Sequence, residues 1–239
     1  MPANKIKIGP ALQRRFARQT IRKNKQKRTS CKFLIVCEGE KTEPNYFKSF
    51  PLINNGSYVY ELEVYGGKIN TIGVVDKALE LKNANPDKYD SVWAVFDKDD
   101  FPAENFNQAI INAKNNGINV AWSNEAFELW YLLHFDYIDG KLSRKDYENK
   151  ITEKVKETQK WRKNKNYKYQ KNDIHNYEIM NQCGSMENAI KHSKRLHDHF
   201  IGDQRFHLHK PCTTVYLLVN QLLGRDKDLI DKVMEKINK

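Results

Sequence analysis

The apolar residues of this chain form continuous runs in some segments and a two-residue alternation in another. Residues 33–37 and 91–96 are almost wholly apolar and rich in β-branched and aromatic side chains. This pattern is typical of strands buried on both faces of a parallel sheet. Residues 58–65 alternate apolar and polar positions, which predicts a half-exposed edge strand. A fourth, short strand is predicted at residues 118–122.

Segments with helical spacing separate these strands. In residues 71–83 the apolar positions recur at the three- and four-residue spacing of an amphipathic helix. Further helices are predicted at residues 42–50, 103–115 and 124–134. Alternation of strand and helix is the signature of a doubly wound α/β unit, so we expect one α/β domain over residues 32–135.

The character of the sequence changes after residue 136. Residues 141–172 are polar and rich in lysine, with scattered aromatic rings, whereas residues 185–200 and 213–223 have helical spacing. We therefore expect residues 136–239 to form a mainly helical extension packed on the sheet, with a mobile loop at residues 160–175.

Positive charge is concentrated at the start of the chain. The formal net charge is +11, from 41 Lys or Arg against 30 Asp or Glu, and residues 1–31 hold ten of the basic residues and none of the acidic ones. A basic arm on a nearly neutral body favours binding to phosphate backbones through counter-ion release. The alternative is a solvated leader without a specific partner.

The apolar and cysteine patterns argue against membrane-spanning and disulfide-rich proteins. No segment approaches the roughly 18 consecutive apolar residues of a membrane span, and the first residues lack the apolar run of a signal peptide. The four cysteines form no CxxC pair, so neither a zinc ribbon nor a disulfide framework is indicated. We therefore expect a cytoplasmic protein without a membrane partner.

Acidic residues directly follow both strongly apolar strands. Glu38 follows the first strand, and Asp97, Asp99 and Asp100 follow the other. In an open α/β sheet, ligands bind beyond the carboxyl ends of the strands, where these acids would meet if the strands are neighbours. Carboxylates gathered in this way need a cation, and oxygen ligands favour Mg²⁺ or Mn²⁺. Glu38, Asp97, Asp99 and Asp100 are therefore candidate metal ligands.

Nearby charged residues give further candidates. Glu40 and Glu43 would complete a second metal site, although Glu43 could instead cap its helix. Lys41 would stabilise negative charge on a phosphate, unless it is only a surface lysine. Glu128 lies in an aromatic helix, where an unpaired acid is costly to bury, so it either reaches the site or pairs with a cation. His134 is predicted to be a core histidine.

Cations interleaved with aromatic rings mark a second region that would contact substrate. Residues 161–171 alternate Lys and Arg with Trp161, Tyr167 and Tyr169. Cations suit phosphates and rings suit unstacked bases, which favours single-stranded nucleic acid or RNA loops; the alternative is a solvated loop. With the arm included, the predicted nucleic-acid-binding residues are Arg14, Arg15, Arg18, Arg22, Lys23, Arg162, Lys163, Lys165, Lys168 and Lys171.

Several motifs resemble known families. A Glu-Gly step after one apolar strand and Asp-x-Asp after another resemble the Toprim motif of primases, topoisomerases and OLD-type nucleases. More closely, four stretches resemble the RloB-like family, which accompanies restriction-modification and other phage-defence loci. They are VCEGEKTEPNYF at 36–47, FDKD at 96–99, SNEAFELWYLLHF at 123–135 and PCTTV at 211–215. The basic arm lies outside these motifs, so its role rests on charge alone.

The resemblance implies a Toprim-like, Rossmann-like parallel sheet flanked by helices, with metal-dependent phosphodiester chemistry. Carried onto this chain, the Toprim glutamate is Glu38 and the aspartates are Asp97 and Asp99. Aspartates in that position hold the metal, and the glutamate binds metal or acts as general acid or base.

The function so implied is a Mg²⁺-dependent nuclease in phage defence. Its partners would be nucleic acid, either RNA such as tRNA or DNA, and other proteins of the defence system. A nucleotidyl-transferring Toprim enzyme and a non-catalytic nucleic-acid-binding subunit are the alternatives.

Overall fold

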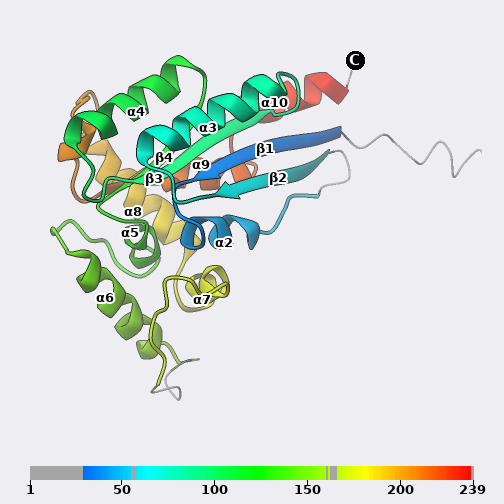
Figure 1. Ribbon diagram of the computed structural model, residues 1–239. Coiled ribbons are helices and arrows are strands. Elements are labelled where there is room, and N and C mark those ends of the chain that lie inside the picture. Colours follow the sequence, from blue (N-terminus) through cyan, green and yellow to red (C-terminus); the bar gives the residue numbers. More distant parts are fainter. Residues whose placement is uncertain (1–28, 55–57, 160, 162–165, 238–239) are drawn as a thin grey trace, which may run out of the picture.

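The computed structural model describes residues 29–54, 58–159, 161 and 166–237 (Figure 1). Its strands are β1 Thr29–Cys37, β2 Tyr58–Gly66, β3 Ser91–Asp97, β4 Asn119–Asn124 and β5 Cys212–Thr213. They form a five-stranded sheet in the order β2-β1-β3-β4-β5. The first four strands are parallel, and β5 is antiparallel to β4. The predicted parallel sheet is confirmed, and β5 is a strand that the sequence pattern did not reveal.

The two central strands bury both of their faces. In β1, Phe33 and Ile35 pack into one hydrophobic core, and Leu34 and Val36 pack into another on the opposite side of the sheet. Successive side chains of a strand point to opposite faces, so both cores draw on the same apolar run. All residues of β3 are buried as well. This double burial is why these two segments show no polar alternation.

Helices cover the two faces of the sheet in separate sets. The core that contains Leu34 is covered by α3 Thr71–Ala84 and α4 Ala103–Asn115. The core that contains Phe33 is covered by α2 Thr42–Lys48, α5 Glu128–Leu132 and α9 Val215–Leu222. Figure 1 shows α3 and α4 on one side of the sheet and α2 on the other. The architecture is therefore α/β and Rossmann-like, as predicted.

The chain after residue 136 adds further helices to the second face. They are α6 Arg144–Glu157, α7 Asn176–Cys183, α8 Met186–Asp198 and α10 Lys227–Ile237. A 3-10 turn, η1 at Phe206–Leu208, instead packs beside α4 on the opposite face. The predicted helices at 185–200 and 213–223 are confirmed by α8 and α9. The expected boundary at residue 136 stays a prediction, and the extension also supplies β5 to the sheet.

α6 was not predicted because its buried face is narrow. The helix begins at Ser143, whose side chain accepts a bond from the Asp146 N–H while the Asp146 carboxylate accepts one from the Ser143 N–H. It buries only Tyr147, Ile151 and Val155, each four residues from the next, among Lys and Glu side chains.

Within the described residues, no helix is both long and apolar enough to cross a membrane.

Candidate functional site

The candidate site lies where β1 and β3 end side by side. Their register pairs Cys37 with Val95, so the residues that follow emerge at the same edge of the sheet. The Glu38 N–H donates to the Val95 carbonyl at 2.9 Å. The Asp97 N–H in turn donates to Glu38 Oε2 at 3.0 Å. The strand register thus holds these two acids against each other, at the edge where ligands of open α/β sheets bind.

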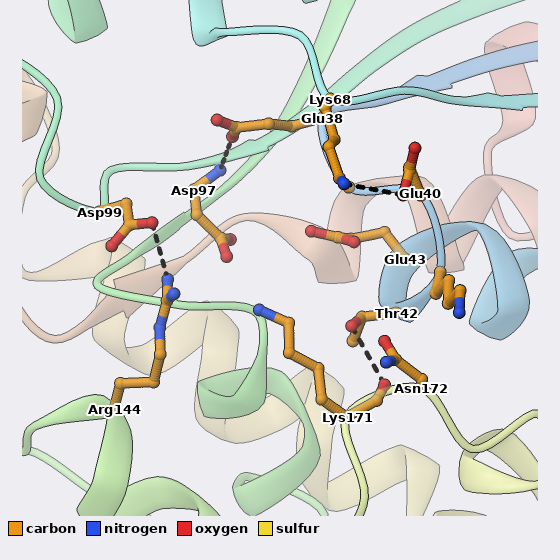
Figure 2. Close-up of a pocket in the computed structure, with 12 residues that line it drawn as sticks. Glu38, Glu40, Thr42, Glu43, Lys68, Asp97, Asp99, Arg144, Lys171 and Asn172 are labelled. Atoms are coloured by element: carbon orange, nitrogen blue, oxygen red, sulfur yellow. Dashed lines mark hydrogen bonds and ion pairs between the residues drawn. The ribbon is translucent and has the colours of Figure 1, made fainter.

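A cavity of about 460 Å³ opens at this edge (Figure 2). Its lining combines predicted acids with basic residues from several parts of the chain: Glu38, Gly39, Glu40, Lys41, Thr42, Glu43, Lys68, Asp97, Asp99, Arg144, Lys171 and Asn172. Two predicted site residues are absent from this described lining. Asp100 is exposed to solvent in the loop after β3, and Glu128 is fully buried. Asp100 therefore lies outside the cavity that the other acids share.

Asp97 is the most constrained acid of the cavity. Its side chain is only 7% exposed, and Oδ2 accepts a bond from the Phe127 N–H at 3.1 Å. The other oxygen, Oδ1, is buried without a hydrogen-bond partner among the described residues. Burial raises the pKa of Asp97 well above its usual range, and the nearby carboxylates of Glu43, Glu128 and Glu38 raise it further. Burial and these neighbouring charges therefore disfavour the ionised form of Asp97.

Glu43 presents a second unpaired oxygen. It lies in the first turn of α2 and is 5% exposed, and its Oε2 has no hydrogen-bond partner within the part of the chain described. Gly39 makes room for it, because a Cβ at that position would lie 2.3 Å from Glu43 Oε2. Burial raises the pKa of Glu43. Figure 2 shows the side chains of Glu43 and Asp97 pointing toward each other.

Glu38 is less deeply buried than these two acids. Burial raises its pKa to about 7, and the hydrogen bond from the Asp97 N–H offsets only part of that increase. Glu43 and Asp99 contribute further to the rise through their negative charge. Glu38 therefore changes its protonation state close to neutral pH.

Glu128 lies behind the cavity rather than in its lining. It is fully buried; the Tyr169 hydroxyl donates to Oε1 at 3.2 Å, and Lys171 Nζ lies 4.0 Å from the same oxygen. Both predicted alternatives therefore apply to Glu128. Its negative charge raises the pKa of Asp97, and its side chain also faces the Lys171 ammonium. His134 is 1% exposed and its Nδ1 lies 3.0 Å from the Trp130 carbonyl, in agreement with the core reading.

Two cations from the extension face the acids. Arg144, the first residue of α6, forms an ion pair with Asp99, with Nη2 3.1 Å from Oδ2. Lys171 is fixed by its backbone, because its carbonyl accepts a bond from the Thr42 hydroxyl at 3.1 Å. In Figure 2 both side chains rise from the extension toward Asp97 and Asp99. We call Glu38, Glu43, Asp97 and Asp99 the acidic wall, and Arg144 and Lys171 the basic wall.

Sequence reasoning missed Arg144. The residue follows the Ser-x-x-Asp capping signal at Ser143, so the start of a helix was visible in the sequence. Its proximity to Asp99 was not visible, because it depends on how α6 packs against α5 and α7. Lys68, which also lines the cavity, was not predicted either; it lies 3.8 Å from Glu40.

The acidic wall offers carboxylate oxygens, which are the type of ligand that a hard cation prefers. Its unpaired, buried carboxylate oxygens are ligands of the kind that Mg²⁺ and Mn²⁺ prefer. Among the described residues, however, no group of three or more His, Cys, Asp or Glu side chains is close enough to hold an ion as the side chains stand. Glu38 is engaged by the Asp97 N–H, and Asp99 by Arg144. Coordination would therefore require at least one of these side chains to change its conformation.

The prediction that the aromatic rings after α6 are available to stack on bases is wrong. Tyr167 and Tyr169 are 9% and 4% exposed, and both belong to the same core as Phe33. The Tyr169 N–H also donates to the Thr152 hydroxyl at 3.0 Å. These rings are therefore packed inside the protein and do not present a surface for stacking bases. The described part of the expected mobile loop is docked on its neighbours.

The predicted nucleic-acid-binding residues fall into two groups. Lys168 is exposed and Lys171 lines the cavity. The others lie outside the described residues: Arg14, Arg15, Arg18, Arg22, Lys23, Arg162, Lys163 and Lys165. Their part in binding stays a prediction.

Comparison with known proteins identifies the family of this chain. A family model described as RloB-like protein matches residues 33–222. Neither the curated proteins nor the solved structures include a significant match. The matched region runs from β1 to the end of α9, so it contains both the acidic and the basic wall.

Proposed function

This chain belongs to the RloB-like family, and from that premise we propose that it is a metal-dependent nuclease of the Toprim class that acts in phage defence. The observation that carries the proposal is the burial of Asp97 among other acids, with one oxygen unpaired among the described residues. A buried group of carboxylates is stable only when it is protonated or neutralised by cations. A divalent ion is the natural neutralising partner for oxygen ligands of this kind.

The acidic wall would supply the ligands. Glu38, Asp97 and Asp99 would hold Mg²⁺ or Mn²⁺, and Glu40 and Glu43 are the candidates for a second ion. When bound, the ion would neutralise charge on the scissile phosphate and make a bound water more acidic. The acids that hold it lie at a backbone-fixed edge of the sheet, which favours precise placement.

Other residues of the cavity suit the substrate and the proton transfers. A pKa of about 7 lets Glu38 exchange a proton near neutral pH, as a general acid or base requires. Lys41 and Lys171 line the cavity and would attract the phosphates of RNA, such as tRNA, or of DNA. Glu128 would act from behind the cavity, through its charge on Asp97 and its contact with Lys171.

The test is cleavage of end-labelled tRNA, single-stranded DNA and duplex DNA by the full-length protein with Mg²⁺ or Mn²⁺. We expect cleavage of one substrate class that stops with EDTA and in the Asp97→Asn variant. Asp76→Asn is the matched control, because Asp76 is an exposed acid on α3 outside the cavity. Its cleavage rate should equal that of the wild type.

Two other results would point elsewhere. Binding of nucleic acid without cleavage, unchanged by Asp97→Asn, would contradict the nuclease proposal and favour a non-catalytic binding subunit. Incorporation of labelled nucleotides into a primer, abolished by the same substitution, would favour the nucleotidyl-transferring alternative.

A further inference from the structure

Arg144 occupies an unusual place for a cation that begins a helix. The guanidinium of this first residue of α6 reaches the acidic wall and pairs with Asp99 at 3.1 Å. The two side chains are 34% and 36% exposed, so the pair lies between the interior and solvent. A positive charge at a helix N-terminus is not favoured by the helix dipole. The acids of the cavity must therefore account for its position.

Asp99 is held in a backbone conformation that directs it to this contact. Its φ is 39°, in the left-handed region that side chains rarely adopt, although Asp tolerates it better than most residues. Its N–H donates to the Glu125 carbonyl at 3.2 Å, which helps to fix the turn after β3. A conformation of this kind persists only where the surroundings determine it, and such positions cluster at functional sites.

The surrounding charges show what Arg144 does in this arrangement. Burial opposes the positive charge, but Asp99, Asp97 and Glu128 together raise the pKa of Arg144 above its ordinary value. Arg144 thus provides the positive charge that the buried acids lack. The described residues contain no ready group of three metal ligands, and Asp99 is one of the acids already engaged. Arg144 and a metal ion would therefore compete for the same carboxylate.

We infer that Arg144 is an internal counter-ion of Asp99 that yields the carboxylate to the metal and then binds a phosphate of the nucleic acid. This inference rests on the proposed function. The planar guanidinium donates two parallel hydrogen bonds to a phosphate as well as to a carboxylate, so it can exchange one for the other. Lys171, the second member of the basic wall, lies in the same cavity and would contact the same phosphate. Metal and substrate binding are thereby coupled.

Arg144→Gln should change the affinity for metal and the affinity for RNA in opposite directions. Arg144→Gln removes the competitor for Asp99, so Mn²⁺ alone, titrated by calorimetry into the full-length protein, should bind about three- to ten-fold more tightly. A fluorescein-labelled single-stranded RNA 20-mer, measured by anisotropy with Ca²⁺, should bind more weakly by a similar factor. Arg225→Gln is the matched control, since Arg225 is ion-paired with Glu187 away from the cavity. It should change neither affinity.

A second variant separates a local effect from misfolding. Arg144→Lys keeps the charge but not the planar fork, so Mn²⁺ affinity should stay near the wild-type value while RNA affinity is only partly restored. Weaker Mn²⁺ binding by Arg144→Gln, with the wild-type melting temperature, would overturn the inference. Equal RNA binding by the wild type and Arg144→Gln would also overturn it.

Aspartate variants test the same competition from the other side. In EDTA, Asp99→Asn releases Arg144, whereas Asp97→Asn leaves the ion pair in place. The RNA 20-mer should therefore bind more tightly to Asp99→Asn than to Asp97→Asn, and equal binding would contradict the inference. These binding measurements do not depend on cleavage. A wild type that cleaves nothing would defeat the proposed function alone, whereas a cleaving wild type with the wrong sign for Arg144→Gln would defeat only this inference.

Discussion

The acidic and the basic walls of the cavity are built in different ways. The acids follow strands whose register fixes the backbone, and Asp97 and Glu43 are nearly inaccessible to solvent. The cations come from the extension, and their side chains are a third or more exposed. Like charges are thus largely buried on one side, while the neutralising charges opposite them lie on partly exposed side chains. The difference teaches that the buried acids set the requirement for positive charge, and that more than one kind of cation can meet it.

The largest effect is expected from neutralising the acidic wall. Asp97→Asn should lower the cleavage rate by about 10²–10⁴-fold, the range for loss of a positioned catalytic group. The same change should raise the melting temperature in EDTA, because burial and the neighbouring acids disfavour the ionised form of Asp97, whereas Asn carries no charge. Thermal unfolding beside Asp76→Asn checks the second effect. A lower melting temperature for Asp97→Asn would mean that the buried charge is compensated.

A smaller effect is expected where the extension satisfies the acids. Tyr169→Phe removes the hydroxyl that donates to Glu128 Oε1, so the free energy of unfolding should fall by about 1–3 kcal/mol. Urea denaturation measures this change. Tyr65→Phe is the control, because Tyr65 is 41% exposed on β2. An unchanged midpoint for Tyr169→Phe would show that the hydroxyl does not stabilise the buried acid.

The pH dependence of stability should distinguish the metal-free from the metal-bound protein. The pKa of Glu38 is raised from 4.5 to about 7 in the folded state, so its contribution to stability is fully present below pH 4.5 and is lost as the pH rises through 7. In EDTA, the melting temperature should therefore fall as the pH rises from about 4.5 to about 7 and should level off above that. Mn²⁺ binds the charged form and should reduce this slope, as should Glu38→Gln. A slope that Glu38→Gln leaves unchanged would assign the effect to another group.

The smallest effect is expected at the rim of the cavity. Lys68 and Glu40 are 3.8 Å apart with side chains 86% and 50% exposed, and such surface pairs contribute about 0–1 kcal/mol. A double-mutant cycle with Lys68→Ala and Glu40→Ala should therefore give a coupling energy within this range, and salt should reduce it. A larger, salt-insensitive value would place the pair with the buried acids instead.

The acidic wall could be predicted from sequence because its positions are local. Two continuous apolar runs identify the strands, and each run ends directly in the acids that the structure places in the cavity. The basic wall could not be predicted in the same way. Arg144 reaches Asp99 only after α6 has packed, and α6 shows just three buried positions. Contacts of this kind depend on the packing of distant segments, which periodicity does not encode.

For the aromatic residues after α6, the sequence pattern predicted exposure where the structure shows burial. Tyr167 and Tyr169 stand among lysines, and the alternation of rings and cations indicated an exposed surface for bases. The structure buries both rings in the main core, because successive side chains of an extended segment can face the interior and the solvent in turn. The alternation of aromatic rings with lysines therefore indicated an extended segment with one buried face. Composition alone does not distinguish the two cases.

The place of β5 in the sheet has a consequence for synthesis of the protein. The Thr214 N–H donates to the Trp122 carbonyl at 2.8 Å, and the Thr214 hydroxyl accepts from the Trp122 N–H at 2.9 Å, so the edge of β4 is completed by a segment 92 residues further along the chain. A chain growing on the ribosome acquires Asp97 and Asp99 long before these partners emerge. The sheet edge beside β4 therefore stays unpaired until residues 212–214 have been synthesised.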